Sequence, residues 1–181
     1  MLTLSGCYMV RGPRGIDSVT LQAPLQAGKS VYVPIAPDGR YKPWMSATLK
    51  DAPGSGKAAA EALYDEVRLR QPRSVLGVAA ETEEQALASA RAKGLEYVFY
   101  PRVNEWTEAS YWTCSPEYKD IVNVDLSVYD VASGKAIKID RLYNGGCATR
   151  VFQIPVGIGT VEGRFRQVLQ TWLGQNQFVA R

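Results

Sequence analysis

The sequence contains no histidine, and this single absence removes several kinds of chemistry. None of its 181 residues supplies imidazole, which is the commonest general base and the commonest metal ligand in proteins. Nucleophiles activated by histidine, whether serine or cysteine, are excluded for the same reason. Any catalysis would depend on carboxylates, lysine or tyrosine.

Long apolar runs and a strong net charge are also missing. No stretch approaches the roughly 20 apolar residues that a membrane-spanning helix needs. Lysine and arginine total 21 against 18 aspartates and glutamates, and the resulting net charge of +3 is small and evenly spread. This balance argues against nucleic acid as a partner. With 46% hydrophobic residues, the chain is long enough for one domain with its own core.

Cysteine is scarce too, and the first of the three ends a short motif. Leu4-Ser5-Gly6-Cys7 resembles the bacterial lipobox, in which a signal peptidase cuts before a cysteine that has received a diacylglyceryl group. We therefore expect Cys7 to be acylated, with an ordinary thiol as the alternative. The residues before it are fewer than the roughly 7 to 15 of a signal peptide's apolar region. We expect the sequence to begin late in such a peptide or after trimming.

The stretch that follows the motif has the composition of a linker. Residues 8–28 are interrupted by glycine and proline and show no sustained periodicity. We expect residues 1–28 to form a lipobox remnant and flexible tether, and residues 29–181 to form one globular domain. Arg11 and Arg14 would then lie beside a lipid surface and be attracted to it, or be solvated linker charges.

The clearest pattern in the chain is an alternation over residues 121–131, which predicts a strand with one buried face. Its buried positions are Val122, Val124, Leu126 and Val128. Ser133-Gly134 predicts a tight turn, after which residues 136–140 run back as the second strand of a hairpin. In this register Val128 faces Ile139, and both side chains point inward.

The other elements follow from periodicity and from their caps. Thr82 and Gln85 form a capping box at the start of one helix, and Pro34 places the first strand at an edge or ends it. In chain order we expect a strand over Ser30–Ile35, a helix over Lys57–Arg70, a strand over Ser74–Ala79, a helix over Glu83–Lys93, a strand from Leu95 that runs on to Trp112, the hairpin, and a last helix that buries Val161, Phe165, Val168, Leu169 and Trp172.

These elements predict an α/β fold of the α+β kind, in the order strand, helix, strand, helix, three strands, helix. Two strand–helix units imply right-handed crossovers and parallel pairing among the first three strands, whereas the hairpin adds antiparallel strands. We therefore expect a single mixed five-stranded sheet with helices packed on it and an antiparallel C-terminal meander.

Gly54-Ser55-Gly56-Lys57 invites comparison with a phosphate-binding loop. The motif would need glycine at Asp51 and serine or threonine at Ala58, and no apolar strand leads directly into it. We expect no nucleotide here and interpret the segment as a flexible lead into the helix.

The two remaining cysteines are candidates for a disulfide. Cys114 and Cys147 leave neighbouring strands near the same end of the predicted central strand, where the two chain ends can curl together. We expect a disulfide between them, consistent with an oxidising compartment, with two free thiols as the alternative. Without histidine, three cysteines are too few for the usual four-ligand metal site, so we expect neither a metal nor another cofactor.

Nearly the whole chain resembles an uncharacterised family of bacterial lipoproteins, known only as a domain of unknown function. The likeness is carried by the lipobox at Leu4–Cys7, Val31–Val33 followed by Asp38–Tyr41, Gly54–Gly56 opening an alanine-rich helix, Tyr100-Pro101 with Trp106 and Trp112 downstream, and Val128–Asp130 before Ser133–Lys135. The resemblance implies an acylated periplasmic domain without a known activity. Tyr8, in place of aspartate after Cys7, implies transport to the outer membrane. Cys114 and Cys147 are not part of the family's pattern.

The order of elements is also similar to a domain of envelope assembly lipoproteins, such as the curli secretion lipoprotein, activators of penicillin-binding proteins and the N-terminal domain of the Tol propeller protein. There the domain binds other proteins, although a shared fold does not assign a function. We therefore expect a non-enzymatic outer-membrane lipoprotein that contacts envelope proteins or its own copies. Candidate contact residues are Trp44, Trp106, Tyr111 and Trp112, with core packing as their alternative role.

Two other functions remain open. A module that binds a glycan strand or small molecule would hold an aromatic platform between the loops Tyr41–Gly56 and Pro155–Gly159. A carboxylate enzyme would use Glu105, Glu108 and Asp125, and would need a deep pocket that raises their pKa values.

Overall fold

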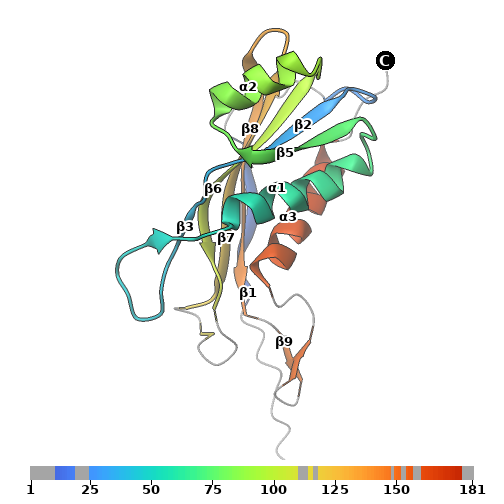
Figure 1. The fold of residues 1–181 in the computed structure, drawn as a ribbon. Helices are drawn as coiled ribbons and strands as arrows, with labels where there is room; N and C mark the ends of the chain where they lie inside the picture. The colour runs from blue at the N-terminus through green and yellow to red at the C-terminus, as the bar shows by residue number, and fades with distance from the viewer. Residues whose placement is uncertain are drawn as a thin grey trace, which may run out of the picture.

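A large mixed sheet, a small two-stranded sheet and three helices are the elements of the described part of the chain (Figure 1). The computed structural model describes residues 11–18, 25–109, 114–115, 118–147, 149–151, 154–156 and 160–176. The strands are β1 (Arg11–Ser18), β2 (Val31–Ile35), β3 (Arg40–Tyr41), β4 (Lys50–Asp51), β5 (Ser74–Ala80), β6 (Tyr97–Thr107), β7 (Asp120–Asp130), β8 (Lys135–Gly146), β9 (Thr149–Val151) and β10 (Ile154–Val156). The helices are α1 (Ser55–Arg68), α2 (Glu83–Ala92) and α3 (Val161–Gln175).

The strand order confirms the mixed pairing. The strands lie in the order β1-β8-β7-β6-β2-β5, while β3 pairs with β4 and β6, and β9 pairs with β10 in a sheet of their own. β2 runs parallel to β5 and β6, and the ladder from β6 to β1 is antiparallel. The α+β class is therefore confirmed. The main sheet has eight strands rather than five, because β1, β3 and β4 fall in segments without clear alternation.

Strand β1 lies in the segment for which we expected a flexible tether. It pairs antiparallel with β8 at Arg11 and over Arg14–Ser18, with a register shift between them. A Cβ atom on Gly15 would come within 2.3 Å of the Tyr143 hydroxyl oxygen, so glycine is what allows β1 to approach β8 here. A residue that suggested a linker is thus a packing requirement, and the tether is corrected for these eight residues.

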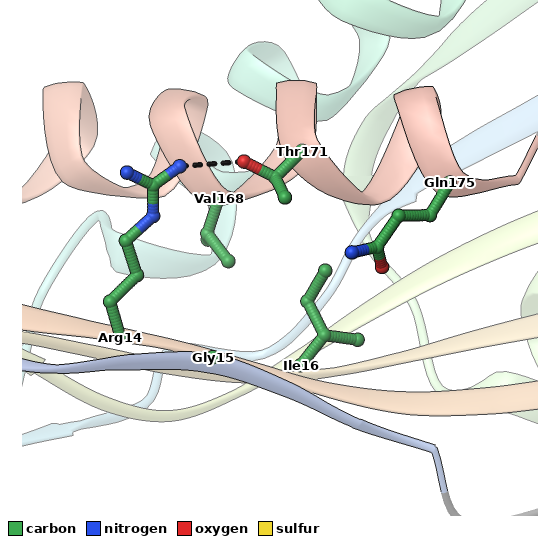
Figure 2. A pocket seen from close by; sticks show the side chains of 6 residues that line it. All are labelled: Arg14, Gly15, Ile16, Val168, Thr171 and Gln175. Atoms are coloured by element: carbon green, nitrogen blue, oxygen red, sulfur yellow. Dashed lines mark hydrogen bonds between the residues drawn. The ribbon is translucent and has the colours of Figure 1, made fainter.

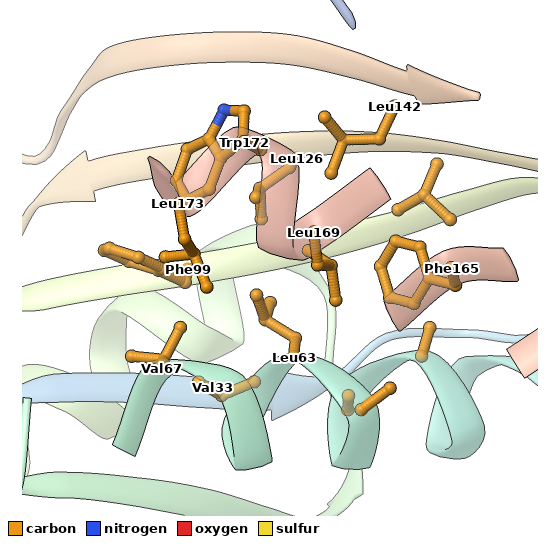
Figure 3. Close-up of a cluster of buried hydrophobic side chains, with 14 of the residues drawn as sticks. Val33, Leu63, Val67, Phe99, Leu126, Leu142, Phe165, Leu169, Trp172 and Leu173 are labelled. Carbon is orange, nitrogen blue, oxygen red and sulfur yellow. The ribbon is translucent and has the colours of Figure 1, made fainter. Parts of the chain in front are cut away.

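Two apolar cores lie on opposite faces of the sheet. The larger is covered by α1 and α3, which contact each other, and contains Phe99, Phe165 and Trp172 (Figure 3). The Phe99 ring meets the Trp172 indole edge-on, with centroids 6.0 Å apart. The smaller core lies under α2 and contains Tyr32 and Tyr100. Burial on both faces explains why β2 and the start of β6 are almost continuously apolar.

The helices begin close to their predicted positions. Gln85 N–H donates to the Thr82 hydroxyl at 3.3 Å and Thr82 N–H donates to the Gln85 side chain at 2.8 Å, which confirms the capping box of α2. The five apolar residues predicted for the last helix are buried in α3. Within the described ranges, no helix combines the length and hydropathy needed to cross a bilayer.

The register of the β7–β8 hairpin differs from the prediction. Asp130 pairs with Lys135 across a wider turn, and its carboxylate accepts hydrogen bonds from the backbone N–H and the hydroxyl of Ser133 at 2.8 and 2.7 Å. A bulge follows, and Val128 lies opposite Lys138 instead of the predicted isoleucine. The prediction is wrong because two shifts combine: Asp130 stabilises a wider turn, and the one-residue bulge then moves Lys138 opposite Val128.

The changed register turns two charged side chains into the larger core. Lys138 and Asp140 are almost fully buried, and their charged atoms lie 3.3 Å apart. The indole N–H of Trp172 donates to Asp140 at 2.6 Å. Since a lone charge would be costly there, each of the two depends on the other.

Two strands also differ from the prediction, one in its position in the sheet and the other in its length. β2 lies inside the sheet rather than at its edge, and its pairing with β5 shifts between Val33 and Ile35, where Pro34 has no N–H to donate. β6 ends at Thr107 instead of running on to Trp112, which lies outside the described residues.

Candidate contact surface

An apolar loop tip projects from one edge of the sheet. β3 and β4 pair with each other, and the loop between them holds Trp44 and Met45, which are 58% and 86% exposed, and the exposed Leu49. Its base is fixed because the Lys42 N–H donates to the Thr107 hydroxyl at 2.9 Å. Figure 1 shows the loop standing away from the helices and the rest of the sheet. Large apolar side chains on an anchored, exposed loop are typical of a contact site.

Of the four predicted contact residues, the structure exposes Trp44 and packs Trp106. Trp106 lies opposite Val122 and so faces the larger core, where its ring meets Phe165 edge-on with centroids 5.8 Å apart. Packing therefore accounts for Trp106, which was the alternative that the sequence left open. Tyr111 and Trp112 lie outside the described residues.

A pocket of about 280 Å³ opens between β1 and α3 (Figure 2). Ile16 lines it from β1 and Val168 from the facing helix α3, while Arg14 lies at one end, bound to Thr171, and Gln175 lies at the other. The Arg14 guanidinium donates to the Thr171 hydroxyl at 2.6 Å, which holds its long side chain against the helix. The pocket thus combines apolar side chains on two sides with polar groups at its ends, as small binding sites generally do.

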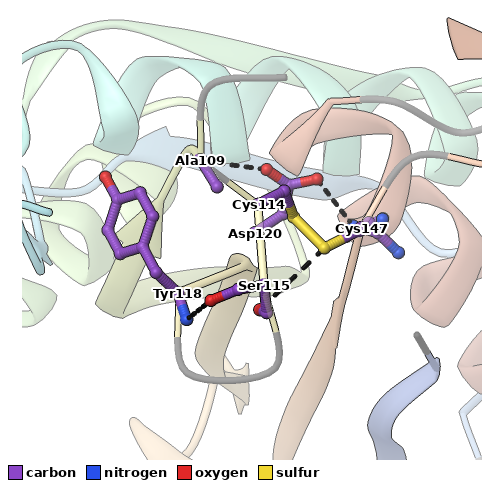
Figure 4. Close-up of a disulfide and its surroundings, with 7 residues drawn as sticks. Ala109, Cys114, Ser115, Tyr118, Asp120 and Cys147 are labelled. Atoms are coloured by element: carbon purple, nitrogen blue, oxygen red, sulfur yellow. Dashed lines mark hydrogen bonds and ion pairs between the residues drawn. A yellow bond between two sulfur atoms is a disulfide. The ribbon is translucent and has the colours of Figure 1, made fainter. Parts of the chain in front are cut away.

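The structure joins Cys114 and Cys147 in the predicted disulfide, with their Cα atoms 5.7 Å apart (Figure 4). Beside it, Asp120 accepts hydrogen bonds from the Ala109 N–H at 3.0 Å and from the Arg164 guanidinium at 3.1 Å. Burial raises the pKa of Asp120 despite these two donors. The disulfide and the Asp120 contacts together fix the chain at the ends of β6, β7 and β8.

The amino-terminal end of α1 already binds a carboxylate of the same chain. Asp38 accepts hydrogen bonds from the backbone N–H groups of Gly54 and Gly56, both at 2.9 Å. A Cβ atom on Gly56 would lie 2.0 Å from the carbonyl oxygen of Ala36, so this glycine serves close packing. A phosphate would have to displace Asp38 from the N–H groups that phosphate-binding loops use.

The carboxylates considered for catalysis do not gather at the pocket between β1 and α3, which is lined by none of Glu105, Glu108 and Asp125. Burial opposes ionisation of Asp125, but hydrogen bonds from Arg141 and Asn104 outweigh burial and lower its pKa. A general acid would need the opposite shift. Within the described residues, no three acidic or cysteine side chains come together as metal ligands.

Sequence reasoning missed much of what the structure brings together. Met45 and Leu49 could have been found with Trp44, because they are large apolar residues in a polar loop. The pocket gave no local signal, since its hydrogen bond from Arg14 to Thr171 joins residues 157 positions apart. Of the loop Pro155–Gly159, which was predicted to flank a ligand platform, residues 157–159 lie outside the described part of the chain.

Comparisons with known proteins identify a shared fold. No family model matches this chain, and no curated protein does. Among solved structures, the PelC dodecamer from Paraburkholderia phytofirmans has a subunit that is similar over 91% of this chain and 98% of its own, with a TM-score of 0.62 and 18% identity. A variant PelC dodecamer from the same organism gives a TM-score of 0.58 and 16% identity over 90% of this chain and 98% of its own. At such identities the likeness shows the fold alone.

The C-terminal domain of LpoB from Salmonella enterica is a more distant match. It covers 66% of this chain and 84% of its own, with a TM-score of 0.42 and 14% identity. This score is too low to support a conclusion about either the fold or the function of the chain.

Proposed function

We propose that this chain is a non-enzymatic lipoprotein of the bacterial cell envelope, acylated at Cys7 and tethered to the outer membrane, whose periplasmic domain acts through protein–protein contacts. Its foremost partner is a further copy of itself. The observation that carries this proposal is the fold shared with PelC, whose solved form is a dodecamer. Self-assembly needs an exposed complementary surface on each subunit, and the loop tip with Trp44 and Met45 offers apolar area for one.

The envelope location is supported by two independent features of the chain. Leu4-Ser5-Gly6-Cys7 has the residues of a lipobox. The bond between Cys114 and Cys147 is of a kind that persists in oxidising compartments, including the bacterial periplasm. In the cytosol, these two cysteines would be kept as free thiols.

A non-enzymatic role fits the electrostatics of the acids. Asp125 is held ionised by Arg141, whose guanidinium lies 2.8 Å from its carboxylate. Asp120 has a raised pKa, but its carboxylate is almost fully buried and bound to Arg164 and to a backbone N–H. Neither is placed to exchange a proton with a substrate at the pocket.

The lipid anchor is tested by feeding cells a palmitate analogue that can be detected by click chemistry. The wild-type protein should be labelled and should fractionate with the outer membrane. Cys7→Ser should lose the label, whereas Cys114→Ser, the matched control, should keep it. A native Cys7 thiol without a lipid, on protein that remains in the cytosol, would overturn this part of the proposal.

The partner is tested by crosslinking the full-length acylated protein in intact cells and identifying what it captures. We expect copies of the same chain as the dominant product, in a ladder of increasing subunit number. Products that contain one copy only, whatever the crosslinker length, would contradict self-assembly.

A further inference from the structure

The chain carries an exposed apolar loop tip and a pocket at opposite edges of one antiparallel ladder. The loop tip with Trp44 and Met45 is attached to β6 through β3. The pocket lies beside β1, which pairs with β8 at the far side of that ladder. Strands β6, β7 and β8 therefore separate the two features, and they are too far apart in the sheet to meet within one molecule.

We propose that Trp44 of one copy docks into the pocket between β1 and α3 of a second copy. This inference rests on the self-assembly proposed above, and it names the two surfaces that meet. The occupant is a second copy because the same chain supplies both an exposed indole and a pocket of suitable size, and because the shared fold occurs in a dodecamer.

The pocket has the chemistry that an indole needs. Its volume of about 280 Å³ suits one large side chain, and Ile16 on β1 and Val168 on α3 provide apolar contacts from two sides (Figure 2). The Arg14 guanidinium at one end can stack on the face of the indole, since arginine often stacks on aromatic rings and tryptophan is the best ring for a cation–π contact. The Gln175 amide oxygen at the other end can accept from the indole N–H.

The exposure of Trp44 gives the contact its driving force. An indole that is more than half exposed in the monomer becomes buried on docking, and tryptophan is one of the residues most enriched at interface hot spots. Met45, beside it, is flexible enough to pack around the pocket rim. Both side chains would leave water in the same step.

The contact joins two different surfaces, so it is heterologous. Each copy that donates its Trp44 still has its own pocket open, and copies therefore add head to tail until the rotation between neighbours closes the assembly. The inference thus predicts a closed assembly of several copies and no isolated twofold dimer.

The first test compares substitutions at exposed apolar residues in the full-length acylated protein. Trp44→Ala should weaken the association of subunits by at least about thirtyfold, as expected for an interface hot spot. Leu69→Ala, which removes an exposed apolar side chain at the end of α1, should leave association unchanged. Circular dichroism and the melting temperature check that both variants are folded. An assembly unaffected by Trp44→Ala would overturn the inference.

The second test maps the contact directly with engineered cysteines. Trp44→Cys and Gln175→Cys are placed in separate, differently tagged copies that are expressed together. Oxidation should join the two variants to each other, because the remaining cysteines are acylated or already paired. Neither variant expressed alone should form a disulfide with itself. A disulfide between two copies of Trp44→Cys would mean a twofold contact and would overturn the head-to-tail arrangement.

The outcomes also separate this inference from the proposed function. A wild-type protein that stays monomeric in its membrane would contradict self-assembly and the docking together. An assembly that forms normally with Trp44→Ala would contradict the docking alone. If Trp44→Ala instead reduces retention on anionic lipid vesicles, or loses crosslinks to a different protein, while the assembly persists, Trp44 serves a lipid surface or another partner and the docking is wrong.

Discussion

Lys138 and Asp140 lie under α3 with almost no exposure to solvent. The lysine ammonium and the Trp172 indole N–H both contact Asp140 Oδ2, at 3.3 and 2.6 Å. The other carboxylate oxygen, Oδ1, has no hydrogen-bond partner in the described part of the chain. Because desolvation of two charges offsets most of their attraction, this pair adds little net stability, yet each member is needed once the other is present.

Removing one member of the pair should therefore be costly. We expect Lys138→Met to lower the free energy of unfolding by about 3 to 5 kcal/mol, because it leaves Asp140 buried and unpaired. The double variant Lys138→Met with Asp140→Leu should be more stable than this single variant. Urea unfolding followed by circular dichroism measures both. Additive losses in the double variant would contradict the coupling.

The ionisation of Glu96 makes the stability of the fold depend on pH. The Lys29 ammonium, 2.5 Å from its carboxylate, together with the backbone N–H and hydroxyl of Ser30, lowers the pKa of Glu96 below 4.5, its ordinary value. The folded protein therefore binds this proton less readily than the unfolded chain. The contribution of the ionised Glu96 carboxylate to stability is fully present above about pH 4.5. It is lost as the pH falls through the lower pKa that Glu96 has in the folded protein.

The variant Glu96→Gln isolates this contribution. The difference in unfolding free energy between the wild type and Glu96→Gln should be largest near neutral pH and should shrink as the pH falls below 4.5. Unfolding titrations at a series of pH values measure it. A difference that stays constant from pH 7 to pH 3 would contradict the role of the Lys29 and Ser30 contacts.

At the scale of elements, the disulfide ties the segment after β6 to the end of β8. Cys114 and Cys147 are 33 positions apart. A disulfide that closes a loop of that length lowers the conformational entropy of the unfolded chain and so stabilises the fold by about 3 to 4 kcal/mol. We expect Cys147→Ser, or a reductant, to lower the free energy of unfolding by that amount. Cys7→Ser is the control and should have no such effect. Equal stability of oxidised and reduced protein would contradict this.

Local signals explain which elements were predictable from the sequence. The capping box of Thr82 and Gln85 and the helical spacing of Phe165, Val168 and Trp172 act within a few residues, and both were found. The hairpin was predicted, but its register depends on the turn held by Asp130 and on a bulge beside Tyr129, neither of which the alternating pattern indicates. The inward position predicted for Ile139 was wrong, because the one-residue bulge places Lys138 opposite Val128.

Long-range packing explains what could not be predicted. β1 has glycine and proline in a linker-like pattern, and only the close approach of Tyr143 makes Gly15 necessary. The pocket exists because β1 and α3, from opposite ends of the chain, lie together. For the candidate site, Trp44 was found from its residue type, whereas its docking partner needed the three-dimensional arrangement.

At the scale of the whole molecule, three features act together. Cys7 would anchor the chain, the mixed sheet with its two cores would hold the domain rigid, and the loop tip and the pocket at opposite edges would connect copies. A rigid domain with two different contact surfaces assembles without a change of fold. Function then lies in the assembly, and substitutions at the core and at the contact surfaces should have separable effects.

The most direct test of this account is native mass spectrometry of the full-length protein, extracted from cell envelopes in detergent. We predict a complex of several identical subunits, each heavier than its polypeptide by the mass of the lipid on Cys7. Subunits that are released singly from every preparation, with the bare polypeptide mass, would contradict it.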